Sequence, residues 1–254
     1  MAQTLTRPVP VPGRTRDAHY LWSTLAIAAT VYLGFWFTYF GPQLSGTYPA
    51  APLATHVHGW SFFLWYALLP LQAALVRARR VSLHRTLGAL SIGLAVLMVA
   101  TGLLVVGVRM AEVERLGRSS FWSQFGPAIF VTLVLFTGFY VAALVLRRRP
   151  AAHKRLMIVA SVAGMGAAAF RILVAIAGPV GWAAPVGVLA TNLFIVWEML
   201  CDRWRDGRVH PVYRIGFLTC VVAEAGTMLA TPTAAGQFLA RALAWVGRTL
   251  AFLY

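Results

Sequence analysis

Seven long apolar runs alternate with short polar segments along this chain, and each run approaches the ~20 residues that a helix needs to cross a bilayer. The chain has 254 residues, of which 59% are hydrophobic and only 11% are charged, whereas about a quarter of the residues in a soluble domain are charged. Because backbone groups inside lipid must hydrogen-bond to one another, every run is expected to be a helix. The sequence therefore predicts an all-α, polytopic membrane bundle of seven transmembrane helices within residues 20–231. The runs cover residues 20–40, 56–76, 84–108, 124–146, 153–176, 182–200 and 212–231.

The basic residues gather in alternate connections. Sixteen of the 22 lysines and arginines lie in residues 1–19, 77–85, 147–155 and 203–214, and the intervening connections hold three. Since cytoplasmic loops carry the excess of Lys and Arg, the N-terminus is expected in the cytoplasm, with residues 1–19 as a flexible polar tail. Topology and contacts with anionic lipids then explain the net charge of +15, and nucleic acid is not an expected partner. The bias towards arginine and alanine favours a bacterial inner-membrane protein.

The last segment, residues 235–254, is amphipathic. Gln237, Arg241 and Arg248 share one narrow face of a helix, and apolar residues occupy the rest. An interfacial helix fits this pattern best. The alternative is an eighth span, which would return the C-terminus to the cytoplasmic side.

A histidine beside basic residues occurs twice in the chain, 69 residues apart. His84 and Arg85 correspond to His153 and Lys154, and each pair begins an apolar run that leaves the cytoplasmic side. Steps of 7, 11 and 18 residues return to nearly one helix face, and from both histidines they reach mostly small residues. We interpret helices 2–3 and 4–5 as a parallel repeat, related by an axis along the membrane normal.

Two interpretations of the repeated histidines stay open. In the first, His84 and His153 bind lipid headgroups at the membrane surface, and the small residues allow close helix packing. In the second, both histidines ligate the iron of a b-type haem in a slot lined by the small residues. Arg85 and Lys154 would then meet the haem propionates.

Further polar residues lie inside the predicted spans. His58 and Gln72 share one face of the second run, while Arg171, Asn192 and Glu224 occupy the fifth, sixth and last runs. Charged residues within a span need a partner or water, and they are functional candidates by default. Arg171 is expected either to pair with Glu224 or Asn192 in a structural contact, or to bind an anionic solute in the outer half of the bilayer.

Short motifs give the chain two resemblances. The residues that carry the first are His58-Gly59, Gln72, the turn Leu83-His84-Arg85-x-Leu87-Gly88 and the turn His153-Lys154-Arg155-Leu156-Met157. They resemble a family of uncharacterised bacterial multi-spanning membrane proteins over about residues 50–200, which implies an inner-membrane helical protein and no assigned catalytic residue. In architecture the chain also resembles cytochrome b561-type electron carriers, in which four successive helices each offer a histidine, although the run 124–146 has none.

The sequence assigns no enzymatic reaction. It contains no phosphate-binding G-x-x-x-x-G-K-[ST] loop, no G-x-S-x-G elbow and no H-E-x-x-H zinc helix, and its loops are too short for a soluble catalytic domain. Three hypotheses follow. The leading one is electron transfer through haem b or a quinone, the second is a transporter or channel for a small solute, and the third is a non-catalytic membrane component that binds a partner subunit.

Overall fold

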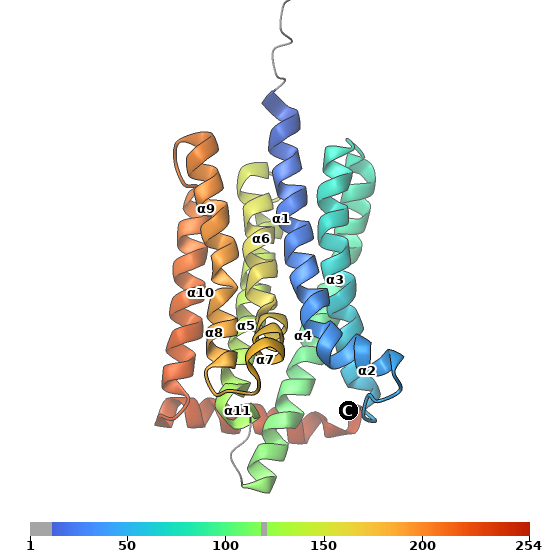
Figure 1. The fold of residues 1–254 in the computed structure, drawn as a ribbon, viewed down its shortest axis with the longest axis vertical. Helices are drawn as coiled ribbons and strands as arrows, with labels where there is room; N and C mark the ends of the chain where they lie inside the picture. The colour runs from blue at the N-terminus through green and yellow to red at the C-terminus, as the bar shows by residue number, and fades with distance from the viewer. Residues whose placement is uncertain (1–11, 118–120) are drawn as a thin grey trace, which may run out of the picture.

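The computed structural model describes residues 12–117 and 121–254, and in these residues the chain is helical without any strand (Figure 1). The prediction of an all-helical membrane bundle is confirmed. The elements are α1 (Pro12–Phe35), the π-helical turn η1 (Trp36–Phe40), α2 (Gly41–Leu44), α3 (Leu53–Arg77), α4 (Val81–Leu116), α5 (Phe121–Val145), α6 (Pro150–Gly164), α7 (Gly166–Ala177), α8 (Ala183–Ala190), α9 (Asn192–Asp206), α10 (Pro211–Ala230), α11 (Ala234–Leu250) and the 3₁₀ turn η2 (Ala251–Leu253).

Between six and seven of these segments are candidate membrane spans. Six helices of the described chain are long and apolar enough to cross a bilayer, and α6 with α7 makes a seventh if this bent pair is one span. The two halves meet at Met165 at an angle of 47°. The expectation of one continuous helix over residues 153–176 is therefore wrong. Gly164 and Gly166 flank the break, and glycine pairs are a common cause of sharp bends.

The N-terminal helix is longer than expected. The flexible tail was predicted for residues 1–19, but α1 begins at Pro12, and residues 1–11 lie outside the described residues. Proline is favoured in the first turn of a helix because its missing N–H would have no partner there. At the other end, α1 continues without interruption into the π-helical turn η1 and then into α2.

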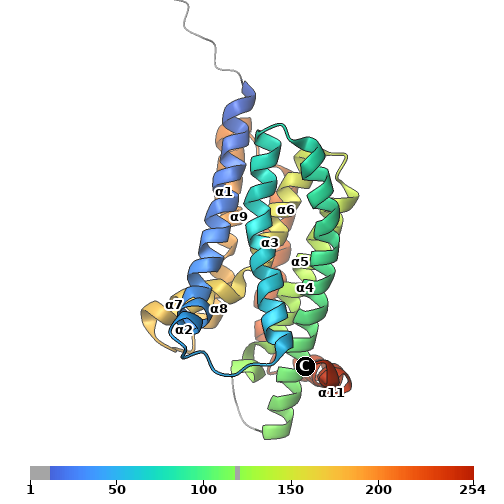
Figure 2. The ribbon, with the colours of Figure 1, turned by 90° about the vertical axis from the view of Figure 1, so that its right-hand side faces the viewer.

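The helices give the bundle two chemically different ends. We call the end that holds the start of α1 and the connections at residues 77–85, 147–155 and 203–214 the arginine-rich end; it is the upper end in Figure 1. The opposite end holds η1, α2, the connection from α7 to α8, and α11 (Figures 1 and 2). Helices α4, α6 and α10 leave the arginine-rich end, whereas α3, α5 and α9 approach it.

Helix α6 lies inside the bundle. All six residues from Ile158 to Ala163 are at most 2% exposed, because α5, α9 and α10 cover α6 and two long side chains of α3 reach it. Trp65 Nε1 donates a hydrogen bond to Ser161 Oγ, and Tyr66 Oη donates one to the Ser161 carbonyl. A helix that is apolar all round is expected to be buried in this way.

Helix α11 lies across the opposite end of the bundle, roughly perpendicular to the long helices (Figure 2). It crosses α4 where Gly107 meets Gly247, and a Cβ on Gly107 would lie 2.9 Å from Gly247 N. Val106 and Met110 of α4 pack around this crossing with Leu243 and Ala244 of α11. An eighth span would run alongside the other helices. Because α11 lies across their ends, its orientation favours the interfacial helix over the eighth span.

Candidate functional site

The two repeated histidines both lie at the arginine-rich end, but each is bonded to a different neighbouring helix. His153 Nδ1 donates a hydrogen bond to the Ala143 carbonyl at the end of α5, at 2.8 Å. The Gln72 side chain of α3 lies beside His84. In the amide orientation that satisfies both of its ends, its nitrogen is 2.6 Å from His84 Nδ1 and its oxygen accepts from Gly88 N. Each imidazole therefore has one ring nitrogen tied to the helix that precedes its own.

The strips of small residues below these histidines are packed against large side chains. Ser91 Oγ is hydrogen-bonded to Tyr140 Oη at 2.9 Å. A Cβ on Gly102 would touch His58 and Leu133, and a Cβ on Gly164 would meet Tyr66 Oη. The strips that would line a haem slot are thus packed against aromatic and aliphatic side chains, and a haem between His84 and His153 stays a prediction.

The two cations expected at the haem propionates point elsewhere. Arg85 is exposed to the surroundings, and Lys154 Nζ lies 4.2 Å from the centre of the Tyr20 ring on α1. The repeat itself also ends early, because α4 continues unbroken for 36 residues whereas its counterpart α6 stops at Gly164.

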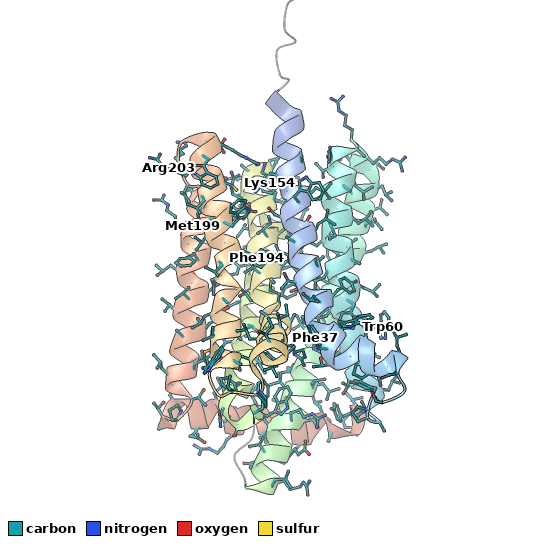
Figure 3. All side chains as sticks on the ribbon, viewed as in Figure 1. Phe37, Trp60, Lys154, Phe194, Met199 and Arg203 are labelled. Atoms are coloured by element: carbon teal, nitrogen blue, oxygen red, sulfur yellow. The ribbon has the colours of Figure 1, made fainter. Side chains whose placement is uncertain are left out.

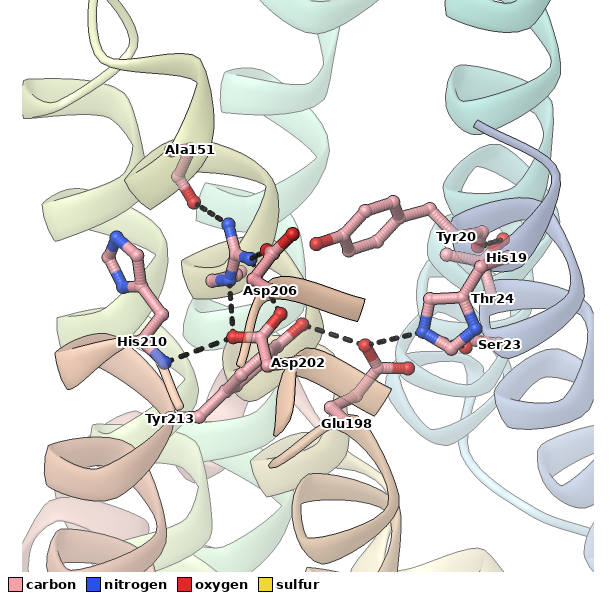
Figure 4. A network of polar contacts seen from close by, with 11 residues as sticks. His19, Tyr20, Ser23, Thr24, Ala151, Glu198, Asp202, Asp206, His210 and Tyr213 are labelled. Atoms are coloured by element: carbon pink, nitrogen blue, oxygen red, sulfur yellow. Dashed lines mark hydrogen bonds and ion pairs between the residues drawn. The ribbon is translucent and has the colours of Figure 1, made fainter. Parts of the chain in front are cut away.

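A buried ion pair joins α6 to α9 at the arginine-rich end (Figure 4). Arg155 Nε donates to Asp202 Oδ2 at 3.0 Å and Arg155 Nη2 to Oδ1 at 2.6 Å, and the two side chains are only 6% and 7% exposed. Such bidentate pairs combine strong hydrogen bonds with a fixed orientation. Asp202 also accepts the backbone N–H of His210, while His210 Nδ1 accepts from Val212 N and caps α10.

A second carboxylate, Glu198, lies one turn earlier on α9. Its Oε2 accepts from Tyr213 Oη of α10 at 2.9 Å and lies 3.0 Å from His19 Nε2 of α1, while Oε1 has no partner although the residue is 2% exposed (Figure 4). Our sequence-based site omitted this network. Glu198 and Asp202 are four residues apart and hence on one helix face, and this spacing is the sequence signal that could have identified the network.

Beside this network an open basin of about 1070 Å³ lies between α6, α9 and α10. Its rim carries the arginines Arg203, Arg205, Arg208 and Arg214, and Figure 3 shows Arg203 at this end of the molecule. Burial lowers the pKa of His210, which also lines the basin, and the positive charges of Arg155, Arg208 and Lys154 lower it further, against the raising effect of Asp202. The lowered pKa favours the neutral imidazole, whose Nδ1 accepts the hydrogen bond from Val212 N.

Arg171 lies near the opposite end, on α7, and contacts neither of its predicted partners. Its Nε donates to Thr38 Oγ1 of η1 at 3.0 Å and its Nη1 to the Ala167 carbonyl. The guanidinium carbon is 4.4 Å from the centre of the Phe35 ring and 4.8 Å from that of Phe170. Across the described residues, no carboxylate approaches Arg171 within the 4 Å of an ion pair and Nη2 makes no hydrogen bond.

The predicted partners of Arg171 instead bond to each other. Asn192 Nδ2 of α9 donates to Glu224 Oε2 of α10 at 2.7 Å. Both side chains are buried, and the remaining oxygens, Asn192 Oδ1 and Glu224 Oε1, have no hydrogen-bond partner. The sequence predicted both residues to lie within spans as candidate partners of Arg171 and did not predict that they pair with each other.

An aromatic pocket of about 790 Å³ opens beside η1. Tyr39 Oη, from the π-helical turn, is hydrogen-bonded to His56 Nδ1 at 2.9 Å in its wall, and Trp60 lies at the same end of the molecule (Figure 3). His58 is outside this pocket and is bonded to Thr101 Oγ1 at 3.2 Å. π-Helical turns often mark functional sites. The lining residues are Tyr32, Trp36, Tyr39, Phe40, Gln43, Leu44, His56 and Trp60.

No protein-family model, curated protein or solved structure matches this chain. The family membership that the motifs imply stays a prediction, as does the architectural likeness to cytochrome b561-type proteins. The chain is a multi-pass helical membrane protein, and its activity has to be argued from its own residues.

Proposed function

We propose that this membrane protein transports a small anionic solute and that Arg171 binds the anion. The observation that carries the proposal is a half-buried guanidinium group on α7 that no carboxylate of the described chain neutralises. A charge in the bilayer region is costly, and such residues pair with a counter-charge or line a water-filled path. An anionic solute at Nη2 would supply the missing counter-charge.

The broken helix supports the same proposal. Arg171 lies on α7, beyond the 47° bend at Met165, and transporters commonly build their substrate sites from discontinuous helices. The contacts of Arg171 with Thr38 and with the Phe35 and Phe170 rings hold its side chain in one orientation. Its unused nitrogen is thus a prearranged donor for an anion.

Anion-dependent swelling of proteoliposomes tests this function. Vesicles holding the purified protein would be mixed with chloride, nitrate or acetate salts, and swelling followed by light scattering. Vesicles with the wild-type protein should swell at least tenfold faster than empty vesicles with one of these anions. Vesicles with Arg171→Gln should swell no faster than empty ones. Arg241→Gln, which removes an exposed arginine from α11, is the matched control. The proposal fails if no anion enters or if Arg171→Gln equals wild type.

A second candidate function is quinone-linked electron transfer. The aromatic pocket favours it, because flat aromatic walls suit a quinone ring. The Tyr39–His56 pair offers a hydrogen-bond donor for a quinone oxygen and a proton acceptor for the O–H of the quinol. Trp36 and Trp60 line the pocket and are half exposed. A short-chain ubiquinone added in detergent should then quench tryptophan fluorescence saturably, and Trp36→Phe with Trp60→Phe should remove most of that quenching.

The remaining sequence-based predictions are retained as proposals. A bacterial inner-membrane location is supported by composition alone. A b-type haem between His84 and His153 would give the purified protein a Soret band that His84→Ala and His153→Ala abolish; the packing of the adjacent strips favours a colourless protein. Loss of both transport and quinone binding would leave the third hypothesis, a non-catalytic component that binds a partner subunit.

A further inference from the structure

One side of α10 carries a line of buried residues that runs from the arginine-rich end towards the opposite end. Tyr213, Gly216, Cys220 and Glu224 follow each other at helical spacing and are all buried. Tyr213 belongs to the Glu198 network, and Glu224 ends the line. Within the bilayer region this line places an acidic side chain against α9.

Glu224 lies at the depth where the neighbouring helices are interrupted. Gly216 packs on Val159 of α6, and both helices leave the arginine-rich end. Glu224 is eight residues beyond Gly216, or about 12 Å, and the break at Met165 is six residues beyond Val159, or about 9 Å. Its partner Asn192 directly follows the interruption between α8 and α9 at Thr191.

No positive charge compensates the Glu224 carboxyl. The helices packed against α10 are α5, α6, α8, α9 and α11, and none of their described lysines, arginines or histidines lies within 4 Å of it. Tyr140, Arg155, Glu198 and Asp202, the buried ionisable side chains of α5, α6 and α9 that make hydrogen bonds, are each bonded elsewhere, and Cys201 of α9 is a free buried thiol. On α11, Arg248 pairs with Glu114 and Arg241 is exposed, while Cys220 lies one turn away on α10.

A carboxylate at 1% exposure with a single amide donor is strongly disfavoured in its charged form. A proton on Oε1 removes the charge. It also gives both unpartnered oxygens, Glu224 Oε1 and Asn192 Oδ1, a hydrogen bond. The new O–H on Oε1 can donate to Asn192 Oδ1 while Asn192 Nδ2 continues to donate to Oε2. A metal ion is a poorer fit, since the described residues hold no group of three or more His, Cys, Asp or Glu arranged for one.

We propose that Glu224 and Asn192 form a proton-binding site that couples proton movement to anion transport. The coupling rests on the proposed function of Arg171, whereas the proton site stands on its own geometry. When the proton leaves Oε1, the hydrogen bond from Oε1–H to Asn192 Oδ1 is lost, the bond from Asn192 Nδ2 to Oε2 remains, and a buried negative charge appears at the level of the broken helix. Entry of one proton together with one monovalent anion moves no net charge across the membrane.

Infrared spectroscopy of the reconstituted protein at neutral pH tests the proton site directly. Wild type should show the carbonyl stretch of a protonated carboxyl group, and Glu224→Gln should lack it. Glu114→Gln, an exposed carboxylate on α4, is the matched control and should keep the band. Asn192→Leu should move the band to higher frequency, which assigns it without altering Glu224. Absence of the band in wild type, or its persistence in Glu224→Gln, overturns the proposal.

Coupling is tested in vesicles that contain a fluorescent pH indicator. An inward gradient of the anion that wild type transports should acidify the interior, and Glu224→Gln should reduce this proton uptake at least tenfold while Arg171→Gln abolishes anion and proton movement together. Equal proton uptake by Glu224→Gln and wild type would refute coupling. If wild type moves no anion, the proposed transport function fails, and the infrared band alone decides the proton site.

Discussion

Arg155 and Asp202 form the ion pair on which the arginine-rich end depends. The pair joins α6 to α9, and Asp202 also holds the start of α10 through His210 N. Asp202→Asn should lower the free energy of unfolding by about 3–5 kcal/mol, because it removes the bidentate partner of a buried arginine and leaves only the more distant, partly exposed Asp206 carboxylate near the charge. Thermal or denaturant unfolding in detergent measures the change.

Asp206 provides the control for that substitution. Its carboxylate is 3.5 Å from Arg155 Nη2 but its side chain is 35% exposed, so Asp206→Asn should cost less than about 1 kcal/mol. Equal destabilisation by the two variants would contradict the assignment of Asp202 as the main partner of Arg155.

His210 gives the protein a predictable sensitivity to acid. Burial, followed by the charge of Arg155, lowers the pKa of His210 below its ordinary value of 6.5 in the folded protein. The unfolded chain therefore takes up the proton first, and stability present above pH 6.5 should fall as the pH drops from 6.5 through the folded-state pKa. His210→Asn keeps an N-cap acceptor and should remove this part of the acid dependence. Unfolding curves of both proteins between pH 7.5 and about 5 check the difference, and parallel curves would contradict it.

At the scale of helices, the crossing of α4 and α11 is the contact most sensitive to an added side chain. Gly107 and Gly247 approach so closely that no Cβ fits between them. Gly107→Leu should destabilise the protein by about 1–3 kcal/mol and release α11 from the bundle. Hydrogen exchange of the α11 amides, compared with that of α6, reports the release.

A second glycine on the same helix is the natural control. Gly93 has nothing within 4 Å of the position of a Cβ, so Gly93→Leu should leave both stability and α11 exchange unchanged. If both leucine variants expose α11 equally, the Gly107–Gly247 crossing is not what holds it.

The apolar runs predicted the long helices well, because hydrophobic length alone decides what can span a bilayer. They did not predict the break at Met165, since the two flanking glycines are tolerated in many continuous helices and packing decides the outcome. Nor did they predict which polar residues pair. Arg171, Asn192 and Glu224 were identified by their charge or polarity, but their partners depend on how α7, α9 and α10 rotate against each other. The two histidines of the sequence repeat do lie at the same end of the bundle. Large side chains of α3 and α5, however, pack against the small residues that follow each histidine along its helix.

At the scale of the whole molecule, the arginines are distributed unequally between the two ends of the bundle. The basic connections at residues 77–85, 147–155 and 203–214 gather at one end (Figure 1), and the basin there is rimmed by Arg208 and Arg214. Basic pockets at the cytoplasmic surface bind anionic headgroups. Directly below Arg214, the side chains of Ile215, Leu218 and Val222 on α10 are more than half exposed, as residues that face acyl chains are. Both features are expected if this end lies at the anionic cytoplasmic leaflet.

Cysteine labelling decides the orientation. Thr47→Cys, in the exposed connection before α3, should react in intact cells with a thiol reagent that does not cross membranes, whereas Arg208→Cys, at the arginine-rich end, should react only after the cells are opened. The two native cysteines are buried, so the unmodified protein gives a low background. Both expectations follow from the excess of arginine on one side, which is retained in the cytoplasm during insertion. The reverse pattern would place Arg171 towards the cytoplasm, and an anion would then meet the aromatic pocket and the broken helix from inside the cell.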